Sequence, residues 1–154
     1  MRYERKTLKD ISFFKKVMNR VALIIIRNNR NDKILCQLRD DKPEVSYAGH
    51  WGVIGGQIEK NEDPLDAIKR EIVEEISCNV EDIEFVNRIN HLKTQYCEKH
   101  ELFIFKGKLD KNSEDIKIGE GQRVDYFTVD EIENLRMSET LKEFIMKNRK
   151  KLLS

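Results

Sequence analysis

The segment from residue 56 to residue 78 reads GQIEKNEDPLDAIKREIVEEISC and predicts the central helix of the fold. Asp63 can cap this helix, and Pro64 suits its first position, where proline gives up no needed hydrogen-bond donor. Apolar residues then recur at helical spacing and form a stripe that should pack on a sheet: Leu65, Ile68, Ile72 and Ile76. We therefore expect a helix that begins at Pro64.

Three glutamates of this helix lie in a band along one flank of the apolar stripe. Glu71 precedes Glu74 and Glu75 by one helical turn, so the three carboxylates are neighbours in space. Each like-charged pair at this spacing costs a helix about 0.2–0.5 kcal/mol, and an anion in the last turn costs about 0.3–1 kcal/mol. A solvated acidic surface is therefore the weaker interpretation, although Arg70 offsets part of the repulsion. A bound divalent cation would offset it better, and an all-oxygen ligand set suits Mg²⁺ or Mn²⁺ rather than zinc.

Two glycines, Gly55 and Gly56, follow a short apolar strand predicted at residues 52–54. Paired glycines let a backbone approach a ligand closely or adopt a positive φ angle. Their carbonyl groups could contribute to a metal site, and Gly56 could lie against a substrate. The pair by itself also fits a simple turn.

From Gly56 onward, the spacing resembles the Nudix box: glycine, five residues, glutamate, seven residues, arginine and glutamate, an apolar residue, any residue, two glutamates, any residue, glycine, and an apolar residue. The matching positions are Gly56, Glu62, Arg70, Glu71, Ile72, Glu74 and Glu75. Ser77 departs from this pattern, because the family has glycine there as a left-handed helix cap. We expect Asn79 to take over that conformation.

This resemblance implies an α/β fold, the Nudix α/β/α sandwich with a mixed β-sheet between helices. It also implies an Mg²⁺-dependent hydrolase, with Mn²⁺ as an alternative, that cleaves a diphosphate linkage in a nucleoside diphosphate derivative. A nucleoside triphosphate, a nucleotide sugar and ADP-ribose all fit this description. Outside the box, residues 50–56 resemble the strand that leads into it, and residues 120–122, Glu-Gly-Gln, resemble a motif of MutT-type members.

The resemblance also implies roles for individual residues. Glu71 or Glu120 would be the base that takes a proton from water, although an exposed glutamate in a polar loop is also common. Arg70 and Glu62 would pair and hold the loop against the helix. The metal ligands would be Glu71, Glu74, Glu75 and the backbone carbonyl of Gly55.

Two residues are candidates for contact with the rest of the substrate. Tyr47, in a polar loop predicted at residues 40–50, could stack on a base or simply pack. Ser138 lies at the start of the terminal helix, where MutT-type members that act on oxidised guanine nucleotides have an asparagine. The stretch 136–139 has none, which weakens an oxidised-dGTP assignment without excluding it.

The remaining elements alternate between strands and helices. Thr128 and Glu131 form a capping box that opens a short helix, and a longer terminal helix follows from Ser138. Residues 1–19 are compatible with a short helix. With no internal repeat or linker in 154 residues, we expect one domain over residues 1–154, with 1–19 as an extension. Strands are predicted at residues 20–27, 33–39, 83–93, 101–109 and 124–128.

Composition narrows the class of partner. Lysine and arginine number 29 against 28 acids, so the net charge of +1 gives no overall field that would attract nucleic acid or a membrane. The apolar run at residues 21–26 is far shorter than the roughly 20 residues that span a bilayer. We expect a cytoplasmic protein whose partner is a small-molecule nucleotide; a homodimer stays open.

Cysteine and histidine usage suggests structural roles. The three cysteines, Cys36, Cys78 and Cys97, include no C-x-x-C pair, which argues against disulfides and against a zinc site. His50, His91 and His100 show no ligand spacing.

Two other functions stay open at this point. One is a nucleotide-binding regulator that keeps the fold without catalysis. The other is an RNA 5′-end pyrophosphohydrolase that uses a basic cluster near the C-terminus, although a solvated helix end explains that cluster equally simply. The cluster consists of Lys147, Arg149, Lys150 and Lys151.

Overall fold

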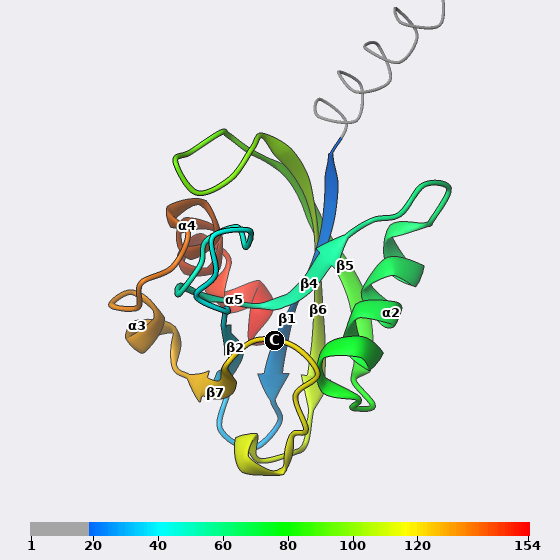
Figure 1. The fold of residues 1–154 in the computed structure, drawn as a ribbon. Coiled ribbons are helices and arrows are strands. Elements are labelled where there is room, and N and C mark those ends of the chain that lie inside the picture. The colour runs from blue at the N-terminus through cyan, green and yellow to red at the C-terminus, as the bar shows by residue number, and fades with distance from the viewer. Residues whose placement is uncertain (1–18) are drawn as a thin grey trace, which may run out of the picture.

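The computed structural model describes residues 19–154, and they form a mixed β-sheet with helices on both faces (Figure 1). The short helix considered for residues 1–19 lies almost wholly outside this range and, like the single domain over 1–154, stays a prediction. Within the described part, the strands are β1 (Arg20–Asn28), β2 (Ile34–Leu38), β3 (Trp51–Gly52), β4 (Ile54–Gln57), β5 (Glu81–His91), β6 (His100–Leu109) and β7 (Arg123–Phe127).

The order of the sheet is β3-β2-β1-β6-β5, with β4 added to β1 and β7 to β2. Only β1 and β6 run parallel among the pairs described; the other pairs are antiparallel. β1 is central because its apolar run is buried on both faces, as in Ile24, Ile25 and Ile26. The predicted mixed sheet is therefore confirmed.

β1 changes partner along its length. Its first half, from Val21 to Ile24, pairs with β4, whereas Arg27 further along pairs with Ile34 of β2. In the first half, Leu23 faces Gly55 and Ala22 faces Gly56. This fork sets the glycine pair against the central strand.

Helices cover the two faces of the sheet and form two cores. Figure 1 shows α2 (Pro64–Ile76) on one side and α3 (Val129–Ile132), α4 (Glu139–Lys147) and α5 (Arg149–Leu152) on the other. Ile68 and Ile72 of α2 pack in one hydrophobic cluster, and Phe144 and Ile145 of α4 pack in the other. The expected α/β/α layering is confirmed. A short 3₁₀ helix, η1 (Ser113–Asp115), lies between β6 and β7.

The N-terminus of α2 is the one that the sequence predicts. Asp63 accepts a hydrogen bond from the Leu65 amide at 2.8 Å, and Pro64 takes the first helical position. Leu65 was expected in the buried stripe, but it is 36% exposed because the first turn extends past the edge of the core. The stripe that packs is Ile68, Ile72 and Ile76.

Two predicted helix ends are wrong. Ser77, not Asn79, adopts the left-handed conformation, with φ 48° and ψ 39°. Its amide bonds to the Ile72 carbonyl, and its hydroxyl donates to the Val73 carbonyl at 2.9 Å, which partly offsets the strain of a side chain in that region. The terminal helix, expected to be continuous, breaks at Asn148, whose side-chain amide bonds the Phe144 carbonyl and competes with the helical ladder.

Smaller differences concern strand bounds. The strand predicted at 52–54 is split at Val53 into β3 and β4, and β4 continues through both glycines to Gln57. β5 begins two residues earlier than predicted and ends at His91. The Thr128–Glu131 capping box is present. In the described range, no helix is both long and apolar enough to cross a membrane.

Candidate active site

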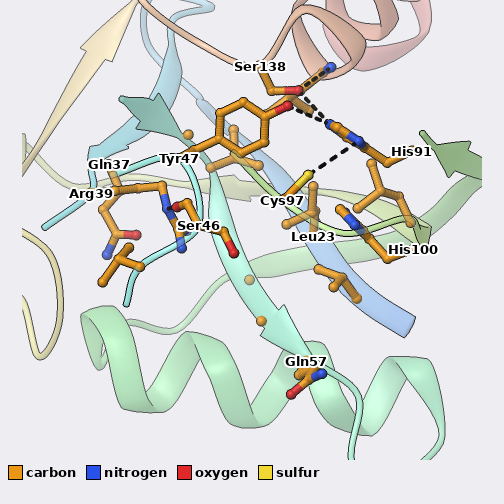
Figure 2. A pocket seen from close by; sticks show the side chains of 18 of the residues that line it. Leu23, Gln37, Arg39, Ser46, Tyr47, Gln57, His91, Cys97, His100 and Ser138 are labelled. Atoms are coloured by element: carbon orange, nitrogen blue, oxygen red, sulfur yellow. Dashed lines mark hydrogen bonds between the residues drawn. The ribbon is translucent and has the colours of Figure 1, made fainter. Parts of the chain in front are cut away.

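A cavity of about 520 Å³ lies beside the fork in the sheet, and residues from many parts of the chain line it. β1 and β4 contribute Leu23, Gly55 and Gly56. Glu71 and Glu75 of α2 form part of the wall, and the loop before β7 adds Glu120. Figure 2 shows Tyr47, His91, Cys97, His100 and Ser138 grouped in another part of the same wall.

Three carboxylates meet in the cavity. Glu71, Glu75 and Glu120 each offer an oxygen, and these atoms lie within 4.8 Å of one another. Glu71 and Glu75 are only 8% and 3% exposed, whereas Glu120 is exposed. Glu74, expected as a ligand, lies outside this group: its exposed carboxylate accepts a hydrogen bond from Arg70 at 3.3 Å.

Burial raises the pKa of the two buried carboxylates, Glu71 and Glu75. The pKa of Glu75 is raised to about 8, mainly by burial and also by the charges of Glu71 and Glu120, although a hydrogen bond from the Gly55 amide at 2.9 Å opposes the rise. Burial also raises the pKa of Glu71, although Arg70 opposes this. The carboxylates are therefore under-compensated by protein charge, which is what a cation would correct.

The donor set fits a hard divalent cation. Every candidate atom in the group is a carboxylate oxygen, the ligand type that Mg²⁺ and Mn²⁺ prefer. Two of the three side chains are held inside the protein, where unpaired negative charge is costly. Glu71, Glu75 and Glu120 could therefore hold such an ion.

The predicted pair between Arg70 and Glu62 is present and bidentate. Arg70 Nε and Nη2 donate to the two Glu62 oxygens, each at 2.9 Å, and Nη1 donates to Glu71 Oε1 at 2.9 Å. Arg70 also bonds the Gln57 carbonyl at 3.0 Å, which ties α2 to the end of β4. This network lowers the pKa of Glu62 to about 2 and fixes one oxygen of Glu71.

Gly55 and Gly56 lie too close to neighbouring atoms to leave room for a side chain. A Cβ atom on Gly56 would lie 2.4 Å from Glu71 Oε1, and one on Gly55 would lie 2.2 Å from the Ala22 carbonyl oxygen. Neither contact is tolerable, so any larger residue would shift the carboxylate or the strand. The glycines thus let α2 bring its glutamates against β4.

The loop that carries Glu120 is fixed by contacts that the sequence did not suggest. The Gly119 amide donates to the Glu75 carbonyl at 2.7 Å, and a Cβ on Gly119 would lie 2.1 Å from the Glu74 carbonyl oxygen. Gln37 Nε2 donates to the Glu120 carbonyl at 2.9 Å. No sequence signal marked Gln37 or Gly119, because both act across the fold.

Tyr47 and Ser138, expected to contact substrate, both line the cavity and meet at one histidine. His91 Nε2 lies 3.0 Å from Ser138 Oγ and 3.1 Å from the Tyr47 hydroxyl, as Figure 2 shows. Ser138 also caps α4 by accepting a hydrogen bond from the Leu141 amide at 3.4 Å. Tyr47 adopts a left-handed backbone conformation, with φ 51°.

A second group of potential ligands consists of His91, Cys97 and His100, with one atom from each within 4.8 Å of the others. Their spacing along the chain predicts separate, structural roles and does not show this group. They meet because β5 pairs with β6 so that His91 faces His100. Burial lowers the pKa of His100.

Comparison with known families and structures gives consistent matches. One family model, described as NUDIX domain, matches residues 18–147. Among solved structures, the MutT protein of Methanosarcina mazei Go1 is similar, with a TM-score of 0.71 at 19% identity, over 87% of this chain and 94% of that one.

Two further structures have the same fold. The E. coli dihydroneopterin triphosphate pyrophosphohydrolase has a TM-score of 0.67 at 16% identity, over 83% of this chain and 92% of that one. The NUDIX domain of Shewanella oneidensis NrtR, complexed with ADP ribose, has a TM-score of 0.72 at 14% identity, over 88% of each chain. At these identities the similarity establishes the fold alone.

Proposed function

Because the chain belongs to the NUDIX family and is a pyrophosphohydrolase of nucleoside diphosphate derivatives, we propose that Mg²⁺ held by Glu71, Glu75 and Glu120 supports the reaction. The observation that carries this proposal is the meeting of these carboxylates, two of them buried, in one wall of the cavity. Mg²⁺ bound there would screen the carboxylates from the diphosphate and offset the charge on its oxygens.

The same metal site has two further candidate ligands. The Gly55 carbonyl belongs to a residue that lines the cavity and whose amide is already bonded to Glu75. Glu74 would join the set only after its carboxylate left Arg70. We propose Gly55 as a backbone ligand and Glu74 as an outer ligand.

Glu120 is our preferred base. One oxygen of Glu71 already accepts a hydrogen bond from the Arg70 guanidinium at 2.9 Å, which leaves only its other oxygen for water. Glu120 is exposed at the cavity, and its backbone is held by Gln37. We expect both Glu120→Gln and Glu71→Gln to weaken metal binding, and Glu120→Gln to lower kcat by about 10²–10⁴-fold even at saturating Mg²⁺.

Arg70 and Glu62 would act as positioning residues. Their bidentate pair holds the guanidinium so that Nη1 faces Glu71. Arg70→Lys would keep the charge but lose this fork, so it should raise the Mg²⁺ concentration needed for half-maximal rate.

The other part of the cavity fits a nucleoside or another flat group. Tyr47 offers a ring, and Ser138 and His91 offer hydrogen-bonding atoms. A volume of about 520 Å³ is within the range of small-ligand sites, about 300–1,000 Å³. We propose that this part holds the nucleoside while the diphosphate lies at the carboxylates, with Gly56 beside it.

A substrate screen tests the function. Purified protein with Mg²⁺ or Mn²⁺ would be assayed against nucleoside triphosphates, nucleotide sugars, ADP-ribose, dinucleoside polyphosphates and capped RNA, with the released phosphate species identified. Glu75→Gln should abolish turnover, whereas Asp66→Asn, an exposed acid on the same helix, should not. Absence of turnover with either metal would refute the proposal and leave the regulator alternative.

The RNA alternative gains no support from the cavity. Lys147 pairs with Glu143 at 2.7 Å and Arg149 with Asp130 at 3.2 Å, and neither lines the cavity. These exposed pairs agree with a solvated helix end.

A further inference from the structure

A compact group of nitrogen and sulfur ligands lies in the cavity wall and shares no residue with the carboxylate group. His91 ends β5, Cys97 lies in the following turn, and His100 begins β6 (Figure 2). One ligand atom from each lies within 4.8 Å of the other two. We propose that His91, Cys97 and His100 bind a soft divalent cation of the zinc type.

The distances fit tetrahedral coordination. Cys97 Sγ lies 3.7 Å from His91 Nδ1. Bond lengths of about 2.3 Å to sulfur and about 2.05 Å to nitrogen, at a tetrahedral angle, separate the two ligand atoms by about 3.5 Å. The spacing of these two atoms therefore already suits a shared ion.

Both histidines have partners for the ring nitrogen that would not bind metal. His100 Nδ1 lies 2.8 Å from the Glu98 carbonyl oxygen, which can only accept, so Nδ1 carries the hydrogen and Nε2 is left to ligate. With Nδ1 of His91 on the metal, its Nε2–H can donate to Ser138 or Tyr47. A second hydrogen bond of this kind orients most metal-bound histidines.

Binding would replace some existing contacts. His91 Nδ1 now lies 2.8 Å from the Leu92 carbonyl oxygen, so the ring must change tautomer and give up this bond. Cys97 would bind as thiolate and release its proton to solvent. His91 and His100 stack with centroids 4.7 Å apart and ring planes 14° apart, and an imidazole binds metal in its ring plane, so the two rings must also rotate relative to each other.

The supporting backbone is short and braced. The Thr94 amide donates to the Cys97 carbonyl at 3.0 Å, and His91 faces His100 in the β5–β6 register. All three ligands thus belong to one hairpin, and His91 is only 2% exposed. A pre-formed hairpin lowers the cost of ordering the ligands.

Three protein ligands leave one tetrahedral position open. Zinc sites of this type take water or a ligand atom in the fourth position. Because the three residues line the same cavity as Glu71 and Glu75, that position would face whatever occupies the cavity. The ion would then be a recognition element separate from the proposed Mg²⁺ centre.

Cobalt titration tests this site. Full-length protein, stripped by chelator, would be titrated with Co²⁺ in excess Mg²⁺, which occupies the carboxylates. We expect one equivalent to give the near-ultraviolet absorption of a cobalt–thiolate bond, and Zn²⁺ to displace it. Cys97→Ser should remove the absorption, His100→Gln should weaken binding by at least about tenfold, and Cys78→Ser should leave it unchanged.

Alkylation gives a second measurement that needs no variant. Zn²⁺ should protect Cys97, but not Cys78, from iodoacetamide, as read by mass spectrometry of the folded wild type. Absence of the cobalt band, its survival in Cys97→Ser, or alkylation of Cys97 unaffected by Zn²⁺ would overturn the proposal. Binding of Co²⁺ without the thiolate band, lost in Glu75→Gln but kept in His100→Gln, would assign the ion to the carboxylates instead. Mg²⁺-dependent hydrolysis is measured separately, so either proposal can fail alone.

Discussion

Replacing Glu75 with glutamine should make the metal-free protein more stable while it removes hydrolysis. The Glu75 side chain is 3% exposed, and burial raises its pKa to about 8 from an ordinary 4.5. Glutamine has the same shape, can still accept the Gly55 hydrogen bond, and carries no charge to bury. In our proposal, the destabilising carboxylate of Glu75 is present because it binds the metal ion.

The magnitude follows from linkage. A pKa raised on folding means that the native state binds more protons, so stability falls as pH rises from about 4.5 and levels off above about 8. At about 1.4 kcal/mol for each pH unit, Glu75 costs about 3 kcal/mol at pH 7 and about 1 kcal/mol at pH 5. Glu75→Gln should recover most of that difference.

Urea unfolding in EDTA at pH 5, 6 and 7 measures the effect. Glu74→Gln is the matched control, because this neighbour is exposed and its substitution should change stability by less than about 0.5 kcal/mol. Adding Mg²⁺ should reverse the order, since saturation at about 100 times Kd stabilises the wild type by about 2.7 kcal/mol. The reasoning fails if Glu75→Gln is no more stable than wild type at pH 7, or if its advantage does not shrink at pH 5.

Three further substitutions test the scaffold around the carboxylates. Ser77→Gly should raise the free energy of unfolding by about 0.5–1 kcal/mol, because it relieves a left-handed serine; unchanged or lower stability in urea would contradict this. Gly56→Ala should lower kcat/KM by about tenfold or more, since its Cβ would meet Glu71 at 2.4 Å; full activity in steady-state kinetics would rule out that contact. Glu62→Gln should remove the part of acid unfolding that wild type shows as pH falls from about 4.5 through about 2, because Arg70 lowers the pKa of Glu62; identical acid transitions by circular dichroism would argue against the pair.

Local signals predicted most of the fold. The start of α2 depends on Asp63 and Pro64, which act within a few residues of themselves, and the sequence marks them clearly. Helical periodicity predicts neither the exposure of Leu65 nor the helix break at Asn148. It does not show where a core ends or where a side chain competes with the backbone for a hydrogen bond. The left-handed conformation of Ser77 was not predicted, because the Nudix box has glycine at this position and a serine rarely adopts that conformation.

The candidate site also contains residues that local spacing predicts and residues that only the folded chain brings together. Glu71 and Glu75 could be assigned from spacing on one helix. The close placement of Glu120 depends on two contacts between distant parts of the chain: the Gly119 amide bonds the Glu75 carbonyl, and the Gln37 side chain bonds the Glu120 carbonyl.

The hairpin group needed the register of two strands. His91 and His100 become neighbours only when β5 and β6 pair, and no spacing along the chain encodes that register.

The change of partner along β1 opens the cavity through main-chain hydrogen bonding. Val21 to Ile24 pair with β4, and Arg27 pairs with β2, so the two branches diverge from one strand. The resulting cavity is lined by the carboxylates and, in another part of its wall, by Tyr47 and Ser138. The same backbone hydrogen bonds could therefore support different substrate preferences. Side chains of the cavity wall, such as Tyr47 and Ser138, would determine which substrate binds.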